Sequence, residues 1–279
     1  MLRTARPGIL WVTLLLCYTS CSPSRAIVTT TKIPYQPSPI TLDGNANDWK
    51  NVPFTFDPAT TFRYAITNDS TNLYICLTST SPGLQNKIFH MGMRVYFDTS
   101  GEKKEACGVQ FPMPIDDNAM KMIAAAGSGL EKSSAAEYRK FILLQENQYE
   151  TFGFPGGGNG MNAIGSTDYV TIGFNLDLED IMVYELKVPL KNIYGTAVPP
   201  SAFTRQMSIG LHIEGIPKSE DPNGQYPSEI GMPGSQMTGA HVGLGKGGGL
   251  QKYGNGSYGS QTIYKDQRAW FRFTLATSK

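Results

Sequence analysis

The sequence has almost no excess of charge of either sign, with 24 lysines and arginines against 23 aspartates and glutamates and a formal net charge of +1 at pH 7. It also has no basic run with interleaved aromatic residues. Proteins that bind nucleic acid or acidic membrane surfaces through electrostatics present a patch of this kind. The composition therefore argues against both classes of partner.

Residues that build metal centres and active sites are scarce. The three histidines have no zinc-site spacing and no cysteine close in sequence, so we predict no zinc site. Serine, histidine and aspartate residues show no nucleophile-elbow pattern. The best carboxylate pair for glycoside hydrolysis is Glu185 and Glu214, each expected on the outward, solvated face of a strand, and nothing in the sequence brings the two together. We therefore predict that the protein is not an enzyme.

Stretches with helical periodicity are also rare, and no internal repeat is visible. What is present is 30 glycines, 18 prolines, 14 tyrosines and 13 phenylalanines, a composition typical of strands joined by long loops. The sequence predicts an all-β fold, a two-sheet antiparallel β-sandwich of jelly-roll or immunoglobulin-like type with roughly nine to eleven strands.

Alternating apolar residues place most of these strands. A run at 141–144 is expected to be a strand that is buried on both faces. The inward rows are Phe62, Tyr64 and Ile66; Leu73, Ile75 and Leu77; Met91, Met93, Val95 and Phe97; Cys107, Val109 and Phe111; Val170, Ile172 and Phe174; Tyr184, Leu186 and Val188; Met207, Ile209, Leu211 and Ile213; and Phe271, Phe273 and Leu275.

The N-terminal residues predict export. Residues 1–21 combine a positive start with an apolar run that is too short to span a bilayer, as in a cleaved signal peptide. Cys21 follows two small residues and is a candidate lipidation site of a bacterial lipoprotein; the alternative is plain secretion after Ala26. Residues 22–38 are rich in Ser, Thr and Pro and are expected to form an extended tether. Residues 39–279 then form a single domain.

Two insertions break the rhythm of the strands. The segment 113–140 carries alanines and methionines and predicts a short helix. The segment 215–261 is rich in Gly, Tyr and Ser and predicts a long loop that cannot pack a core. Loops on a rigid sandwich are common binding sites, although a surface excursion without a ligand is an equally good interpretation.

The stretch 40–49, Ile-Thr-Leu-Asp-Gly-Asn-Ala-Asn-Asp-Trp, combines the end of a strand with a sharp turn. We expect Trp49 to fold back beneath this loop and to plug one end of the core, with its indole N–H bonded to a nearby carbonyl. The alternative is an exposed platform for a sugar.

Five segments in order, "I-x-L-D-G-x-x-x-D-W-x-x-x-P" from Ile40 to Pro53, Asn72 to Ile75, Val95 to Thr99, Tyr184 to Leu190 and Trp270 to Phe273, make up a longer pattern. This pattern resembles the carbohydrate-binding module family 9-like and DOMON-like β-sandwich group, and it covers the chain from about Pro39 to Leu275. The resemblance implies the sandwich fold. It leaves function open, because the group includes sugar-binding modules, haem-binding domains and other exported proteins.

A glycan is the leading candidate ligand, because aromatic faces stack on sugar C–H surfaces and amides satisfy hydroxyl groups. The candidate residues are those of the late loop and its flank: Tyr226, Tyr253, Asn255, Tyr258, Gln261 and Tyr264. The first alternative is a cell-surface protein whose Gly/Tyr loop contacts another protein. The second is a haem-binding electron-transfer domain, which the resemblance brings in with His90, Met91, Met93 and His212 as possible ligands.

Two further sites stay open. Asp98 and Glu102 could supply oxygen ligands to a Ca²⁺ ion on a turn, and no other cofactor is expected. Cys76 and Cys107 lie in the exported domain and would form a disulfide if their strands were neighbours.

Overall fold

The computed structural model describes residues 31–115, 143, 146–165, 169–177, 179–195, 197–216 and 264–278. The predicted signal peptide, Cys21 and the interiors of both insertions lie outside these residues. Within them, no helix is both long enough and apolar enough to cross a membrane.

The strands form two sheets. The seven-stranded sheet has the order β1-β12-β11-β5-β6-β7-β8, and the five-stranded sheet has the order β2-β3-β4-β10-β9. Neighbouring strands are antiparallel except for the parallel pair β1 and β12. Their bounds are β1 (Thr31–Lys32), β2 (Thr55–Phe56), β3 (Arg63–Asn68), β4 (Asn72–Ser79), β5 (Arg94–Asp98), β6 (Gly108–Gln110), β7 (Gln148–Phe152), β8 (Gly160–Ala163), β9 (Thr171–Leu176), β10 (Met182–Pro189), β11 (Met207–Ile213) and β12 (Gln267–Thr274).

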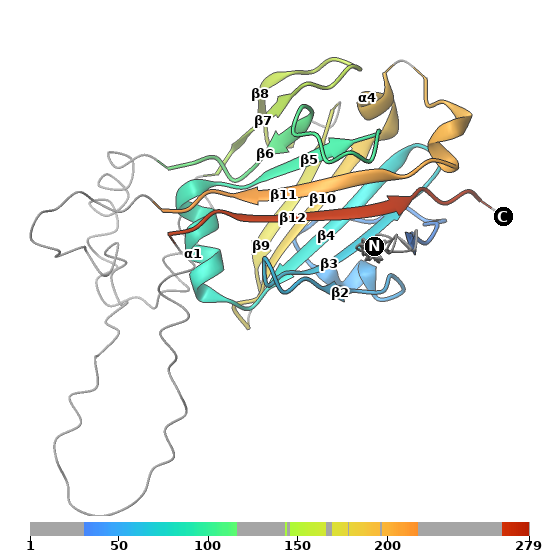
Figure 1. The fold of residues 1–279 in the computed structure, drawn as a ribbon. Coiled ribbons are helices and arrows are strands. Elements are labelled where there is room, and N and C mark those ends of the chain that lie inside the picture. Colours follow the sequence, from blue (N-terminus) through green and yellow to red (C-terminus); the bar gives the residue numbers. More distant parts are fainter. Residues whose placement is uncertain are drawn as a thin grey trace, which may run out of the picture.

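The two sheets pack face to face, with their strands crossing obliquely (Figure 1). The main core lies between them, because each strand alternates its side chains between two faces. The seven-stranded sheet contributes residues such as Val95, Ile209 and Phe271 to this core. The five-stranded sheet contributes residues such as Leu77 and Leu186. The predicted two-sheet sandwich is confirmed.

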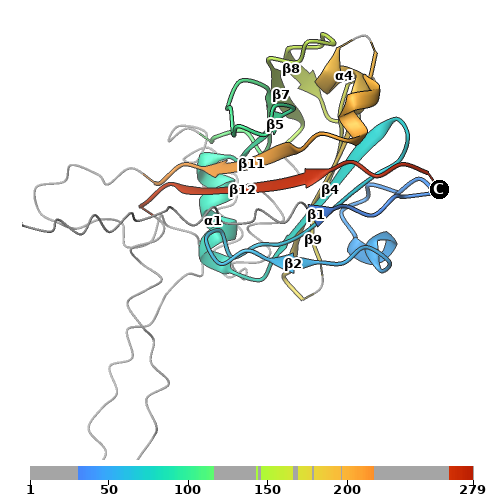
Figure 2. The same cartoon turned by 45° about the vertical axis from the view of Figure 1, so that its right-hand side comes forward.

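The helices that the structure describes in full are the α-helices α1 (Pro82–Met91) and α4 (Leu190–Tyr194) and the 3₁₀ helices η1 (Ala46–Trp49) and η2 (Pro200–Phe203). Helix α1 stands at one end of the sandwich, while the C-terminus lies at the other (Figures 1 and 2). The second view also shows β1 beside β12.

Helix α1 corrects one sequence prediction, because the row from Met91 to Phe97 is not a single strand. The Ser81 hydroxyl accepts a hydrogen bond from the Leu84 N–H at 3.4 Å, and Pro82 occupies the first turn, so the helix has a capped start. It ends at Gly92, whose φ of 69° suits a residue without a Cβ. Met91 therefore closes a helix, and the strand begins only at Arg94.

Two other boundaries also differ from the sequence predictions. Thr31 and Lys32 of the expected tether pair with β12, and Ile33 is buried in the main core, so the described end of this segment belongs to the sandwich. Leu143, the one residue of the run 141–144 that the structure describes, is helical and only partly buried. The predicted strand is therefore wrong at that residue, since an apolar run of this length does not distinguish strand from helix.

Candidate functional site

Three aromatic side chains lie in one row across the outer face of the seven-stranded sheet. Trp270 of β12, Tyr96 of β5 and Phe152 of β7 occupy the same register position, with Gly210 of β11 and Gly108 of β6 between them. Ring centroids lie 6.2 Å apart for Tyr96 and Trp270, whose planes differ by 17°, and 5.8 Å apart for Tyr96 and Phe152. These five residues define the aromatic row.

The two glycines let the flanking rings lie against the sheet. Three atoms of the Trp270 six-membered ring would stand 2.7, 2.8 and 2.9 Å from a Cβ added to Gly210, so the indole lies face-down on that backbone. The Phe152 ring would stand 2.7 Å from a Cβ on Gly108. Trp270 and Phe152 remain partly exposed, whereas Tyr96 between them is buried. At Trp270 the aromatic row therefore exposes the face of the ring and not only its edge.

A polar row runs beside the aromatic row, two residues further along each strand. It consists of Arg268, His212, Arg94, Gln110 and Glu150, which are successive partners across β12, β11, β5, β6 and β7. This second register row gives the aromatic row a border of guanidinium, imidazole, amide and carboxylate groups.

Hydrogen bonds hold most of this border in place. Arg94 donates to Glu214 at 2.5 Å and to Gln110 at 3.1 Å, while Arg268 donates to Glu105 at 2.6 Å. Burial acts against the charged Arg94 guanidinium, but its hydrogen bond and ion pair with Glu214 raise the pKa overall. The two cations of the row are thus already neutralised by carboxylates.

Two further carboxylates, Asp266 and Glu150, lie in or beside this polar row. His212 Nε2 lies 3.3 Å from Asp266 Oδ2, and Asp266 also lies 3.7 Å from Arg268. The pKa of Asp266 is lowered, chiefly because its carboxylate accepts the Gly215 N–H and then the His212 contact. The side chain of Glu150, which is partly exposed, has no hydrogen-bond or ion-pair partner within the described part of the chain.

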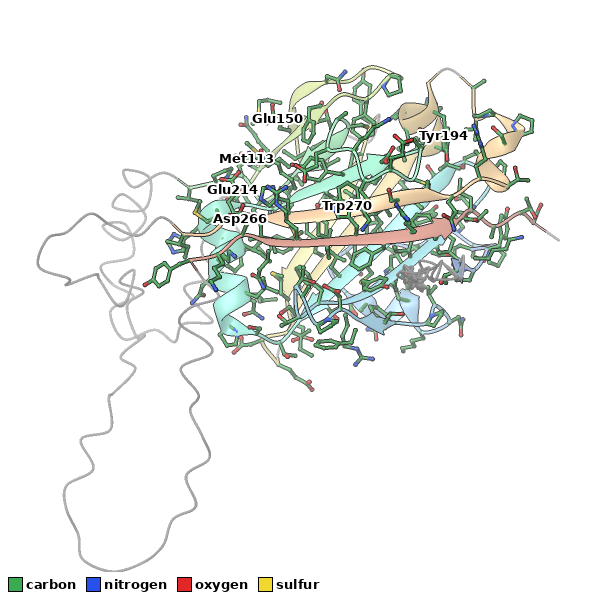
Figure 3. All side chains as sticks on the ribbon, in the orientation of Figure 1. Met113, Glu150, Tyr194, Glu214, Asp266 and Trp270 are labelled. Carbon is green, nitrogen blue, oxygen red and sulfur yellow. The ribbon has the colours of Figure 1, made fainter. Side chains whose placement is uncertain are left out.

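Figure 3 shows how the labelled residues of this face are distributed. Trp270 lies near the middle of the seven-stranded sheet, Glu214 and Asp266 lie toward the end at which α1 stands, and Glu150 lies toward the β7 and β8 side. Burial raises the pKa of Tyr96, the buried centre of the row, with a further contribution from the nearby Glu105 carboxylate. The outer face therefore joins an apolar centre to a hydrogen-bonding periphery.

Among the ligand residues predicted from the late loop, the structure describes only Tyr264. It is partly buried in a turn before β12, and its carbonyl oxygen lies directly against Gly215, where it would clash with an added Cβ. The two stems of the loop are thus side by side, next to Asp266, which accepts the Gly215 N–H at 3.0 Å. Tyr226, Tyr253, Asn255, Tyr258 and Gln261 lie outside the described residues, so their predicted role stays a prediction.

The predicted burial of Trp49 is confirmed, but its partner differs. The side chain is fully buried, and its Nε1–H donates to Glu185 Oε1 at 2.7 Å rather than to a backbone carbonyl. The other oxygen of Glu185 accepts the Gly44 N–H at 2.7 Å. Trp49 therefore belongs to a second apolar cluster, on the outer face of the five-stranded sheet, and is no exposed platform.

Glu185 corrects the expectation of a solvated outward residue. It does point away from the main core, but the stretch 40–49, the opening segment, covers it, and its exposed fraction is 0%. Burial raises its pKa, partly opposed by the hydrogen bonds from Trp49 and Gly44. Glu214 pairs with Arg94 on the other sheet, so these two glutamates lie on different layers and do not form a carboxylate pair.

The predicted calcium residues have other partners. Both oxygens of Asp98 accept hydrogen bonds within its own turn, from the Ser100 N–H and hydroxyl and from the Lys104 N–H. Burial opposes ionisation of Asp98, but these bonds lower its pKa overall. Glu102 pairs with Lys104 at 2.6 Å. In the described ranges, no three His, Cys, Asp or Glu side chains gather as a metal site.

The possible disulfide is not formed, because both cysteines are free. Cys76 of β4 lies in the apolar cluster outside the five-stranded sheet, whereas Cys107, next to β6, packs against the main core from the seven-stranded sheet. Burial raises the pKa of the Cys107 thiol to about 12, and burial together with Glu185 raises that of Cys76 still further. Alternation along each strand does not reveal that the two cysteines belong to different sheets.

The possible haem ligands are dispersed over different elements. His90 and Met91 belong to the end of α1, and Met93 is buried in the main core. His212 lies in the polar row on the outer face, beside Asp266.

Sequence reasoning missed the aromatic row, although part of its signal was present. Tyr96 and Trp270 each alternate with core residues in a strand, which indicates the opposite face. The sequence does not reveal the register of these strands. They are neighbours in the order β12, β11, β5, β6 and β7, which differs from their order along the chain.

The fold and this face define a β-sandwich with an open, aromatic-centred sheet surface. Comparisons with models of protein families, with curated proteins and with solved structures found no match to this chain.

Proposed function

We propose that the protein is an exported, non-catalytic β-sandwich that binds a glycan across the outer face of its seven-stranded sheet. The observation that carries this proposal is the aromatic row, in which Gly210 allows the Trp270 indole to lie face-down on the sheet. The resemblance of the chain to the carbohydrate-binding module family 9-like and DOMON-like group is in keeping with it. The lipoprotein-type N-terminus would anchor the domain to the bacterial cell envelope through Cys21.

The row and its border suit the two kinds of surface that a sugar ring presents. The apolar C–H face of a pyranose packs on an aromatic ring, while its hydroxyl groups take hydrogen bonds from side chains around the edge. Trp270 and Phe152 offer the ring surface. Arg94, Gln110 and Glu150 offer donors and acceptors one register row away.

The charges of the border favour a neutral glycan. Arg94 and Arg268 already pair with Glu214 and Glu105, so neither cation is available without breaking an ion pair. Glu150 adds a carboxylate to the same row. A sulfated or uronic-acid polymer would bring further negative charge to this border, and like charges at an interface weaken binding.

A glycan array probed with the purified protein tests the proposal. We expect binding to neutral oligosaccharides and none to polyanionic ones, with the signal lost in Trp270→Ala. Phe56→Ala is the matched control, because Phe56 is 58% exposed on β2 of the other sheet. Silence across the array from a folded protein, or equal loss in both variants, would contradict the proposal and favour a protein partner at the cell surface.

A further inference from the structure

A pocket lies away from the aromatic row, at the edge where β9 meets the opposite sheet. Its volume is about 200 Å³. Its lining comes from the opening segment, from the ends of β6 and β8, from the segment before β7 and from β9. The lining residues are Leu42, Asp43, Phe111, Leu143, Glu146, Ile164, Ile172, Gly173 and Phe174.

The body of the pocket is apolar and aromatic. Phe111 is buried, and its ring meets that of Phe174 edge to face, with centroids 5.3 Å apart and planes at 82°. Ile172 and Leu143 are partly buried against the main core, and Ile164 is 36% exposed. A ligand that enters therefore meets hydrocarbon and ring surfaces, against which the burial of an apolar group is favourable.

Among the described residues of this lining, the two charged ones, Glu146 and Asp43, are both negative. Glu146 is partly buried, and one of its oxygens accepts the Met113 N–H at 3.3 Å. Asp43 is exposed, and its Oδ1 accepts the Asn45 N–H at 2.9 Å. Neither carboxylate has a Lys or Arg partner within the described chain, which leaves one oxygen of each open to a ligand in that part of the protein.

We propose that this pocket binds a small organic ammonium compound with an apolar body. The ammonium group would lie between Glu146 and Asp43, and the apolar body against Phe111 and Phe174. Charge-assisted hydrogen bonds to carboxylates and contact between a cation and an aromatic ring both favour such a ligand. The inference does not depend on glycan binding, because the aromatic row shares no residue with the pocket.

The state of Glu146 makes the proposal dependent on pH. Burial raises the pKa of this carboxyl to about 7, against a small opposing effect of the Met113 hydrogen bond. The other titratable group in the lining is Asp43 of the opening segment; the lining residues from β6, β8 and β9 carry no titratable side chain. Glu146 is mostly neutral at pH 5.5 and mostly ionised at pH 8, so an ammonium ligand should bind more tightly at pH 8.

Isothermal titration with three related probes tests the proposal on the purified protein. The probes are 2-phenylethylamine, 2-phenylethanol and phenylacetate, which share a phenyl ring on a two-carbon chain and end in a cationic, a neutral and an anionic group. At pH 8 we expect saturable binding of the amine, weaker binding of the alcohol and none of the acid. At pH 5.5 the affinity for the amine should fall about tenfold or more, because the carboxylate is then protonated.

Two variants make the result specific to the pocket. Glu146→Gln should weaken the preference for the amine, since only Asp43 then remains, and should remove the dependence on pH between 5.5 and 8. Ile164→Trp should fill the partly exposed rim and reduce binding of all probes with the carboxylates intact. Glu179→Gln is the matched control, an exposed glutamate in the turn before β10. The proposal is overturned if no probe binds the folded protein, if amine, alcohol and acid bind alike, or if amine binding survives both pocket variants.

Discussion

At the scale of single residues, Glu185 shows how one buried carboxylate organises a segment that is distant in sequence. Its two oxygens accept the Trp49 indole N–H and the Gly44 N–H, each at 2.7 Å, and so hold the opening segment on the outer face of the five-stranded sheet. A buried charge is tolerated when such bonds compensate for lost hydration. The role of Glu185 is therefore structural.

Glu185→Gln tests this role. The amide keeps one acceptor but places an NH₂ group against a backbone or indole N–H, so one buried hydrogen bond is lost. We expect the free energy of unfolding to fall by about 2 to 3 kcal/mol, measured by urea denaturation. Glu179→Gln, on an exposed glutamate, should change it by less than about 0.5 kcal/mol. Equal stabilities of the two variants would contradict the assigned role.

The raised pKa of Glu146 predicts that the stability of the folded protein depends on pH. Its pKa is raised to about 7 in the folded state, above the ordinary value of 4.5. A raised carboxyl pKa contributes stability that is fully present below the unfolded pKa and is lost as the pH rises through the folded pKa. Native protein should therefore lose stability relative to Glu146→Gln between about pH 4.5 and pH 7.

The size of this loss is about 1 to 2 kcal/mol once solvent screening is allowed for. Urea denaturation of both proteins at pH 4.5, 6 and 8 measures it. The difference should grow over this series in favour of the variant. A constant difference would show that the carboxyl of Glu146 titrates alike in the folded and unfolded chains.

At the residue scale, the sequence correctly predicted that Trp49 is buried, since a large indole after a tight turn has few other stable positions. It did not predict the partner. Glu185 lies 136 residues away in the chain, and its outward position in an alternating strand looks the same whether water or another segment covers it. Burial by a distant loop leaves no local signal.

At the scale of elements, the aromatic row depends on two glycines inside strands. The three atoms nearest to a Cβ on Gly210 all belong to the far end of the Trp270 side chain, which can move away. A Cβ on Gly108 would stand 2.6 Å from the backbone oxygen of Val95 as well as 2.7 Å from the Phe152 ring. The two positions therefore differ in how easily the sheet accommodates a methyl group.

Gly210→Ala and Gly108→Ala should separate these effects. We expect Gly210→Ala to change stability by less than about 1 kcal/mol while it displaces the indole, which a shift in Trp270 fluorescence would report. Gly108→Ala should cost about 1 to 3 kcal/mol, in the range of overpacking in a filled site. Thermal unfolding of both variants gives the comparison, and a larger loss for Gly210→Ala would contradict it.

Most strands could be predicted at this scale because period-two alternation is a local property. Helix α1 could have been found from Ser81 and Pro82, a cap followed by a proline in the first turn. The register of the row could not, since it depends on pairings such as Trp270 with Gly210 and Gly210 with Tyr96, between strands distant in sequence.

At the scale of the whole molecule, the sandwich is held by packing between its layers rather than by a covalent link within the described residues. Cys76 and Cys107 are free and belong to different sheets. The fold class followed from composition and alternation, whereas the assignment of each strand to a layer did not. This assignment is a matter of long-range packing that no short segment encodes.

The two free thiols, Cys76 and Cys107, predict how the protein responds to reductant and to thiol reagents. Reductant should leave the Tm unchanged, because no bond between Cys76 and Cys107 exists to be broken. The thiols of Cys76 and Cys107 should react slowly with a thiol-specific reagent in the folded protein, given the raised pKa of both, and rapidly after denaturation. A Tm that falls by several degrees on reduction would show a disulfide and contradict this arrangement.

The most direct test of the central claim is the affinity for the best glycan of the array, measured by titration for Trp270→Ala and for the late-loop double variant Tyr253→Ala and Tyr258→Ala. If the glycan lies on the aromatic row, Trp270→Ala should weaken binding at least about tenfold, a loss of roughly 1.4 kcal/mol, whereas the double variant should retain most of the affinity. The opposite pattern, with binding lost only in the loop variant, would place the site in the late loop and not on the sheet.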